Sequence, residues 1–172
     1  MTASMAEYSA PAPASAAPAA EEPASVSADI VRAVAFFLGG QRYALPIERV
    51  NEIQQIVAFS DTSHRGSAVV GMVNLRGHVI PAVDMRLLVG LDEETYTLET
   101  PMIIVESQGH TVALIVDEVQ DVLELPDGCM QEVPPLHALA SRMLGVCRLP
   151  DGLLNLLDID RLLTGAVIGE GE

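Results

Sequence analysis

The strongest constraint on the fold of this 172-residue chain is an internal repeat. The segment LGGQRYALPIERVNEI, which starts at Leu38, matches SQGHTVALIVDEVQDV, which starts at Ser107, at an offset of 69 residues. Glycine, Ala-Leu and several β-branched positions coincide in the two segments. Repetition of this kind indicates one supersecondary unit that is used twice.

A second matching block follows each copy in the same order, at an offset of 74 to 75 residues. It pairs Gly71 with Gly145, Gly77 with Gly152, and RLLVG at Arg86 with RLLTG at Arg161. Two blocks in one order favour a duplicated unit of about 70 residues over chance similarity between hairpins. The pattern predicts two related small β-barrels, each closing its sheet so that no free edge remains.

Short apolar runs separated by turn residues indicate β-hairpins. The turns are expected at Gly39-Gly40, Gly77, Gly109 and Asp151-Gly152. Two short helices are expected over 84–89 and 158–163, because each begins near an Asp and precedes a Gly, and a helical turn is possible over 135–142. The chain is therefore expected to be mostly β, as a barrel or a sandwich.

The charge of the chain excludes several kinds of partner. Its formal net charge is −15, all nine basic residues are Arg, and no Lys is present. Nucleic acid and anionic membranes would repel such a chain, and aromatic residues at 3% leave little for base stacking. We expect neither a nucleic-acid partner nor direct membrane insertion, since no apolar stretch approaches 18 residues.

The two ends of the chain differ in composition from the rest. In residues 1–29, 20 are Ala, Pro or Ser and none is basic, so this leader is expected to be disordered. The expected ordered domain spans residues 30–165, with barrels at roughly 38–90 and 107–165, and residues 166–172 form a short tail. The leader could be a tether, a partner-binding arm or a segment without a contact.

Cys129 and Cys147 are the only cysteines, and they make a weak case for a disulfide in a chain with this much apolar sequence. A reduced cytosolic compartment is the simpler assumption. The two residues are then expected to behave as small apolar side chains.

Known catalytic and cofactor-binding patterns are missing from the sequence. There is no G-x-S-x-G, H-E-x-x-H, C-x-x-C or dinucleotide fingerprint, and the four histidines lack a second ligand at metal-binding spacing. The acidic clusters Asp92-Glu93-Glu94 and Asp117-Glu118 are interpreted as charges that solvate the surface. The sequence therefore predicts a protein that is not an enzyme and needs no cofactor or metal.

One turn is a candidate interaction site. In VVGMVNLRGHVIPAVDMR, Arg76 stands beside Gly77 between two apolar strands, and Asn74 can bond locally to the turn. A planar guanidinium held there suits recognition of a carboxylate, within the chain or on a partner. Glu52 is a candidate for the carboxylate that orients Arg76, although an ordinary solvated turn residue is the alternative.

Four segments together resemble the CheW family of bacterial chemotaxis coupling proteins. They are YALPIERVNEI, GMVNLRGHVIPAVDMRLLVGL, ALIVDEVQDVL and LGVCRLPDGLLNLLDIDRLL, and the match runs from about Ile30 to Gly165. The run N-L-R-G-x-x-I-P-x-x-D-x-R is its specific part. The resemblance implies an all-β fold of two packed five-stranded SH3-like β-barrels with short helices.

The resemblance also implies a function. Members of this family are adaptors that join the cytoplasmic tip of methyl-accepting chemoreceptors to the regulatory, CheW-like domain of the histidine kinase CheA, in membrane-associated arrays. Carried over by motif, the receptor-coupling positions are Arg76, Glu52, Asn74, Gly71, Val50 and Val122, and Gly145 falls at a kinase or partner interface. The location implied is cytoplasmic, with recruitment to chemoreceptor arrays.

Other functions stay open at this point. The chain could serve another chemosensory system, such as pilus-based motility, or could bind the kinase as a ring component without touching receptors. A different class of protein, a barrel that binds a small molecule or catalyses a reaction between the repeats, would require a concave apolar pocket with convergent polar groups.

Overall fold

The computed structural model describes residues 31–56, 59–61, 67–92, 94–126 and 128–164. The expected disordered leader and the short tail lie outside this part of the chain. The strands are β1 (Val31–Leu38), β2 (Gln41–Pro46), β3 (Val50–Gln55), β4 (Phe59–Asp61), β5 (Val69–Leu75), β6 (His78–Asp84), β7 (Pro101–Ser107), β8 (His110–Ile115), β9 (Glu118–Leu125), β10 (Met130–Gln131), β11 (Met143–Leu149) and β12 (Gly152–Leu157). The helices are η2 (Ile47–Arg49), α2 (Met85–Leu88), η3 (Ala140–Arg142) and α3 (Ile159–Leu163).

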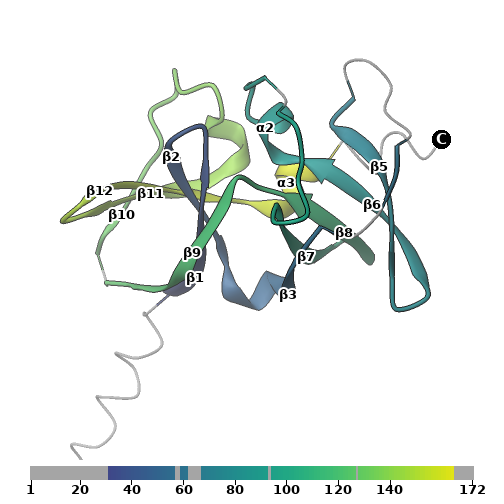
Figure 1. Cartoon of the computed structure of the whole chain (residues 1–172). Coiled ribbons are helices and arrows are strands. Elements are labelled where there is room, and N and C mark those ends of the chain that lie inside the picture. Colours follow the sequence, from purple (N-terminus) through teal and green to yellow (C-terminus); the bar gives the residue numbers. More distant parts are fainter. Residues whose placement is uncertain (1–30, 57–58, 62–66, 93, 127, 165–172) are drawn as a thin grey trace, which may run out of the picture.

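The strands form two six-stranded sheets, which stand beside each other in Figure 1. Sheet A has the order β10-β11-β12-β2-β1-β9, and sheet B has the order β3-β7-β8-β6-β5-β4. The expected all-β fold is confirmed. Each sheet has one strand more than the five expected, because a short strand, β10 or β4, adds to one edge.

The two sheets do not follow the two copies of the repeat. The first copy runs from β1 to α2 and the second from β7 to α3, yet the β1–β2 hairpin lies in sheet A with β9–β12. The β7–β8 hairpin correspondingly lies in sheet B with β3–β6. The ranges 38–90 and 107–165 thus describe the repeated sequence, whereas each sheet is built from both copies.

The exchanged hairpins join their new sheets through parallel pairs. Ala44 of β2 lies opposite Leu156 of β12, and Ala113 of β8 lies opposite Ala82 of β6. All other neighbouring strands pair antiparallel. Because the strands of one copy alone leave apolar edges open, exchange of hairpins covers both sets of edges at once.

All four expected hairpins are confirmed as β1–β2, β5–β6, β7–β8 and β11–β12. The two expected α-helices are also present, and each begins as predicted at an aspartate. The Asp84 side chain accepts a hydrogen bond from the Arg86 backbone N–H, and the Asp158 side chain accepts one from that of Arg161. The possible helical turn over 135–142 is a 3₁₀ turn at its end, η3.

The pairing register corrects the alignment of the repeat. Leu75 pairs with His78 at the end of the β5–β6 hairpin, as Leu149 pairs with Gly152 at the end of β11–β12. The structural partner of Gly152 is therefore His78, not Gly77, and the offset stays at 74 up to the helix caps. The extra residue of the second copy lies in α3, where Asp160 precedes the shared Arg-Leu-Leu.

The largest apolar cluster holds the two sheets together. It includes Phe36 and Leu45 from sheet A, Ile103 and Leu114 from sheet B, and Leu162 from α3, all with almost no exposed surface. Two smaller clusters lie within the individual sheets. The sheets therefore pack as one unit, because the shared cluster cannot be kept dry by either sheet alone.

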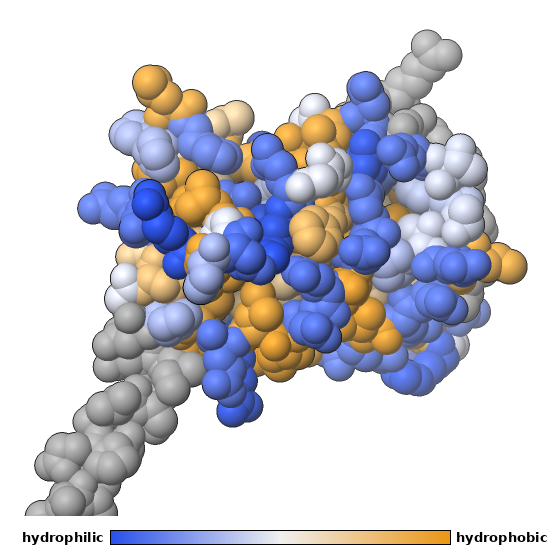
Figure 2. Space-filling view, turned by 60° about the vertical axis from the view of Figure 1, so that its left-hand side comes forward, coloured by the Kyte–Doolittle hydropathy of each residue, from blue (hydrophilic) through white to orange (hydrophobic). Residues whose placement is uncertain are grey.

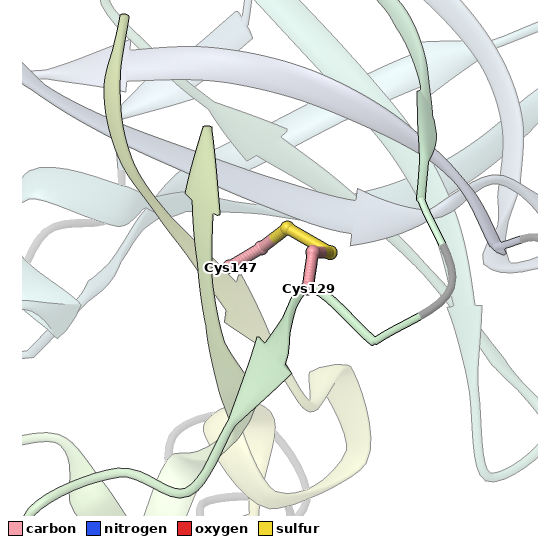
Figure 3. The surroundings of a disulfide bond; sticks show 2 residues. All are labelled: Cys129 and Cys147. Atoms are coloured by element: carbon pink, nitrogen blue, oxygen red, sulfur yellow. A yellow bond between two sulfur atoms is a disulfide. The ribbon is translucent and has the colours of Figure 1, made fainter. Parts of the chain in front are cut away.

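The expectation that both cysteines are reduced is wrong in this structure. Cys129 and Cys147 form a disulfide, and their Cα atoms are 5.0 Å apart (Figure 3). Pairing of β10 with β11 produces this proximity, because Met130 lies opposite Cys147 and Cys129 directly precedes that pair. The separation of 18 residues along the chain gave no sign of the contact.

Candidate functional site

The β5–β6 turn carries the arginine singled out by the sequence. Arg76 has φ of 51° and Gly77 has φ of 88°, so both central residues lie in the left-handed region, as in a type I′ turn. The Asn74 side-chain oxygen accepts a hydrogen bond from the Gly77 N–H at 2.9 Å. The local bond predicted for Asn74 is thus present, and it fixes the backbone that displays Arg76.

Arg76 and Glu52 form a bidentate ion pair. The two guanidinium nitrogens donate to the two carboxylate oxygens at 2.6 and 2.9 Å. The Gln54 side-chain amide donates a further hydrogen bond to Glu52 at 3.2 Å, and the bond to Glu52 raises the pKa of Arg76 above its usual range. The proposed orienting contact between Glu52 and Arg76 is confirmed, although this contact alone does not show what it serves.

The ion pair joins parts of sheet B that are not hydrogen-bonded neighbours. Glu52 lies on β3 at one edge of the sheet, and Arg76 lies at the tip of the β5–β6 hairpin near the other edge. The Arg76 side chain remains 73% exposed, whereas that of Glu52 is 27% exposed. The carboxylate therefore acts as a partly covered anchor, and the guanidinium faces solvent.

Two exposed apolar residues lie close in the sequence to the members of this ion pair. Ile53 follows Glu52 on β3 and is 43% exposed, and Val79 lies opposite Asn74 on β6 and is 63% exposed. Sequence reasoning missed both. For Val79 the alternation of side chains along the strand was an available signal. Ile80 and Ala82 face the core, so the apolar side chain of Val79 faces outward.

The other expected receptor-coupling residues occupy different places. Gly71 lies at a bulge in β5 opposite Ala82. Val50 begins β3 and packs half-buried against the shared core, whereas Val122 is 49% exposed on β9 of sheet A. The described contacts therefore bring together Arg76, Glu52 and the Asn74 turn, but do not connect these residues to Val122.

Gly145 has a clear packing role on β11. A Cβ atom at this position would lie 2.6 Å from the Met130 methyl carbon and 3.0 Å from the Gln131 carbonyl oxygen. Absence of a side chain is therefore what allows β10 to lie against β11 at this point. Whether Gly145 also contacts a partner stays a prediction.

The arginine site has no equivalent in the second copy. The aligned position of Glu52 is Asp121, and the β11–β12 turn consists of Pro150 and Asp151. Asp151 instead forms a bidentate pair with Arg42 of β2, at 2.8 and 3.2 Å, which lowers the pKa of Asp151. Of these two equivalent turns, only the β5–β6 turn of sheet B thus presents an exposed arginine.

A second carboxylate site corrects the interpretation of the acidic clusters. Asp117 accepts a hydrogen bond from the Gly39 N–H at 2.8 Å and pairs with Arg86, which also contacts Glu94 and the Asp92 carbonyl. Asp117 therefore links α2 of the first copy to the second copy. The view that it only solvates the surface is wrong.

A cavity lies on sheet A, and residues of both copies line it, from the β1–β2 hairpin of the first copy and from the β10–β12 region of the second. It measures about 680 Å³, and its lining includes Phe37, Arg42, Val146, Leu153 and His137. Within the described residues, no group of three His, Cys, Asp or Glu side chains could hold a metal ion. Among these residues there is also no helix with the length and apolar character needed to cross a membrane.

Comparison with known proteins gives the family. The family model for the CheW-like domain matches residues 32–167. The chemotaxis protein CheW of Klebsiella aerogenes is 30% identical over 131 residues, which are 75% of this chain and 79% of that protein. The chemotaxis protein CheW of Rhizobium meliloti is 29% identical over 129 residues, or 74% and 83% of the two chains.

More distant relatives and a solved structure agree with this match. Protein PilI of Pseudomonas aeruginosa is 26% identical over 106 residues, which are 61% of this chain and 60% of that protein. The crystal structure of the scaffolding protein TtCheW from Thermoanaerobacter tengcongensis superposes with a TM-score of 0.71 at 25% identity, and the match covers 77% of this chain and 92% of that one. The chain therefore belongs to the CheW-like family, whose members are non-enzymatic scaffolds of chemosensory systems.

Proposed function

We propose that this chain couples methyl-accepting chemoreceptors to the histidine kinase CheA, with the Arg76–Glu52 pair at the receptor contact. The observation that carries the proposal is the bidentate pair itself, in which a turn and a carboxylate hold an arginine that stays 73% exposed. A guanidinium fixed before binding loses little side-chain entropy when a partner engages it.

The geometry leaves donors of Arg76 free for a partner. A guanidinium has five N–H groups, and the pair with Glu52 uses one on each terminal nitrogen. The remaining N–H groups can donate to carbonyl or carboxylate oxygens of a receptor helix. Ile53 on β3 and Val79 on β6 are both exposed, with β7 and β8 between their strands, and each supplies apolar surface of the kind that lies at the centre of protein interfaces.

The mechanism is one of position. The adaptor would hold the cytoplasmic receptor tip and the CheW-like regulatory domain of CheA in a fixed relation, so that a receptor conformational change biases kinase activity. The packed sheets support this role, because a shared core resists relative motion of the two surfaces. The protein would work in the cytoplasm, at membrane-associated receptor arrays, with Gly71, Val50 and Val122 near the receptor and Gly145 near the kinase.

Arg76→Asn tests the receptor contact without disturbing the turn. Asn-Gly is a preferred type I′ sequence, so the hairpin should remain intact while the guanidinium is lost. We expect the affinity for a receptor cytoplasmic tip to fall about 10- to 100-fold, the range typical for loss of a charge-assisted hydrogen bond. Titration calorimetry of the full chain with a receptor fragment measures this change.

Gln108→Asn is the matched control. Gln108 and Gly109 have φ of 51° and 83°, and they form a turn of the same backbone conformation in the β7–β8 hairpin. This variant should bind the receptor fragment as the unmodified chain does. Equal receptor affinity of Arg76→Asn and Gln108→Asn would show that Arg76 has no part in the contact.

A second candidate function is supported by the relative Protein PilI. In this candidate the chain is the adaptor of a different chemosensory system. A ring component that binds the kinase alone is the remaining alternative. Pull-down with a receptor tip and with the CheA regulatory domain, separately and together, distinguishes these cases. Binding to the kinase domain without any binding to receptor tips would favour the ring component.

A further inference from the structure

The disulfide joins β11 to the residue before β10, which is an edge strand of sheet A. β10 lies on the left-hand side of Figure 1, and Figure 2 brings that side forward and shows both apolar and polar side chains on its surface. Cys147 is completely buried on β11, in the apolar cluster of sheet A with Ala35, Leu154 and Leu156. Cys129 is only half-buried and precedes the two-residue strand β10 (Figure 3). Cys147 thus lies inside this cluster, whereas Cys129 packs against it at its boundary.

The bond fastens a segment that has few other attachments at this end. β10 pairs with β11 through only two residue pairs, Met130 with Cys147 and Gln131 with Val146. β10 and the segment that follows it supply Gln131, Glu132, Pro134 and His137 to the wall of the 680 Å³ cavity. Its far end is held independently, because Leu139 is buried in the shared core.

Both redox states of the pair are compatible with this fold. A reduced Cys147 would remain among apolar side chains, where a free cysteine behaves as a small apolar residue. A reduced Cys129 would lie near solvent on a segment held by two residue pairs. The disulfide therefore determines whether β10 is tethered, and the large shared core does not depend on it.

We infer that Cys129–Cys147 is a site of thiol–disulfide exchange with cellular dithiols, and that its reduction releases β10 and the adjoining cavity wall. This inference goes beyond the adaptor function, and its premise of a reducing compartment rests on the cytoplasmic location proposed with that function. Disulfides of proteins in reducing compartments are commonly transient and redox-sensing, whereas permanent staples are typical of secreted domains.

The exchange is balanced in atoms and electrons. A thiolate of the dithiol attacks the Cys129 sulfur, which forms a mixed disulfide and releases the Cys147 sulfur as a thiolate that takes up a proton. The second thiol of the reagent then attacks its own sulfur in the mixed disulfide. The products are the internal disulfide of the reagent and two cysteine thiols, so two electrons and two protons pass to the protein.

The half-buried position of Cys129 determines the direction of attack. Cys129 is the residue open to an incoming thiolate, because it is half-buried, whereas Cys147 has no exposed area. The departing thiolate of Cys147 would carry charge inside an apolar cluster, which is unfavourable. Separation of β10 from β11 relieves this cost by admitting water, and links the chemistry to release of the segment.

The test uses the full-length oxidised chain, equilibrated under native conditions in mixtures of reduced and oxidised dithiothreitol. Acid quenching, alkylation and mass spectrometry count the free thiols. We expect both cysteines to become alkylated together while the circular dichroism of the sheets is unchanged. Hydrogen exchange of peptides covering 128–133 should accelerate at least about fivefold on reduction, because their backbone pairs open.

Three variants make the result specific. Cys129→Ser and Cys147→Ala should each show the fast exchange of 128–133 in every redox buffer. Met130→Leu keeps both cysteines and should retain the redox response. Peptides of the β5–β6 hairpin should exchange equally in all samples.

Three outcomes would overturn the inference. The first is alkylation of both cysteines in the oxidised chain without any reductant, which would mean that no disulfide forms. The second is a disulfide that dithiothreitol reduces only when the whole chain unfolds. The third is reduction that leaves exchange of 128–133 unchanged.

Discussion

Arg76 is one of several arginines that pair with a carboxylate, so pairing alone does not distinguish it. Arg42 and Arg49 also form bidentate pairs, but their side chains are 14% and 32% exposed against 73% for Arg76. These two more covered pairs link segments within the fold, β2 to the β11–β12 turn and η2 to α3. The exposed pair on a turn is the one that can meet a partner.

Gly145 illustrates how a single residue sets the distance between two strands. Gly145→Ala would place a Cβ 2.6 Å from the Met130 methyl carbon, which can move, and 3.0 Å from the Gln131 carbonyl oxygen, which cannot move without displacing β10. We expect the free energy of unfolding to fall by about 1–3 kcal/mol, as for overpacked sites. Urea denaturation measures this change.

Met130→Ala separates the two contributions to that loss. In this background, Gly145→Ala should still destabilise the chain, because the contact with the carbonyl remains. A Gly145→Ala variant as stable as the unmodified chain would show that β10 has no fixed place on β11.

At the scale of elements, turns with two residues in the left-handed region connect two hairpins of sheet B, β5–β6 and β7–β8. Gly77 and Gly109 have φ of 88° and 83°, and nothing lies within 4 Å of a Cβ built on either residue. Substitution by Ala is therefore opposed by backbone strain alone. The two positions form a matched pair, one inside the candidate site and one outside it.

Gly77→Ala and Gly109→Ala should each lower the free energy of unfolding by about 1–2 kcal/mol, because an L-residue with a Cβ is strained in the left-handed region. Gly77→Asn and Gly109→Asn should cost less, since asparagine tolerates this region. Thermal or urea unfolding compares the four variants. Equal stability of the Ala and Asn variants at either position would contradict the strain argument.

At the scale of the whole molecule, one ion pair attaches each α-helix to the other copy of the repeat. The helix supplies the arginine in one pair and the aspartate in the other. Arg86 of α2 pairs with Asp117, which follows β8, and Asp160 of α3 pairs with Arg49, which precedes β3. Asp160 also accepts a hydrogen bond from Ser107 at 2.7 Å. The inserted residue of the second copy is thus the anion that completes this arrangement.

Asp160→Asn should make the free energy of unfolding less dependent on pH in the acid range. Hydrogen bonds from Arg49 and Ser107 lower the pKa of Asp160 below the ordinary value of 3.8 for an aspartate. Because the pKa of Asp160 is lower in the folded chain, the ionised carboxylate contributes fully to the free energy of unfolding above pH 3.8. This contribution is lost as pH falls through the folded-state pKa. The side chain is 39% exposed, so we expect about 1 kcal/mol at neutral pH.

Urea unfolding of both chains between pH 7 and pH 2 measures this contribution. The stability difference should be largest at neutral pH and should vanish at the acid end. In an Arg49→Gln background it should already be small at pH 7. An undiminished difference in that background would exclude the Arg49 pair as its main cause.

Residues close in sequence account for what could be predicted. The four hairpins, the two aspartate-capped helices and the bond from Gly77 to Asn74 follow from local turn and capping preferences. The contact between Glu52 and Arg76 was a hypothesis that spanned 24 residues, and two charges of opposite sign on neighbouring motifs made it accessible. Ile53 and Val79 were missed because burial at a given strand position depends on the whole sheet.

The sequence by itself determined the duplicated unit, its hairpins and the turn that displays Arg76, because these depend on residue spacing and local backbone preference. Only the tertiary structure decided that the copies exchange hairpins, that Cys129 meets Cys147 and that Asp160 meets Arg49. Each of these contacts joins segments whose separation in the chain carries no signal of their distance in space. They arise because strand edges must be paired and apolar faces must be covered, conditions that only the complete set of strands can satisfy.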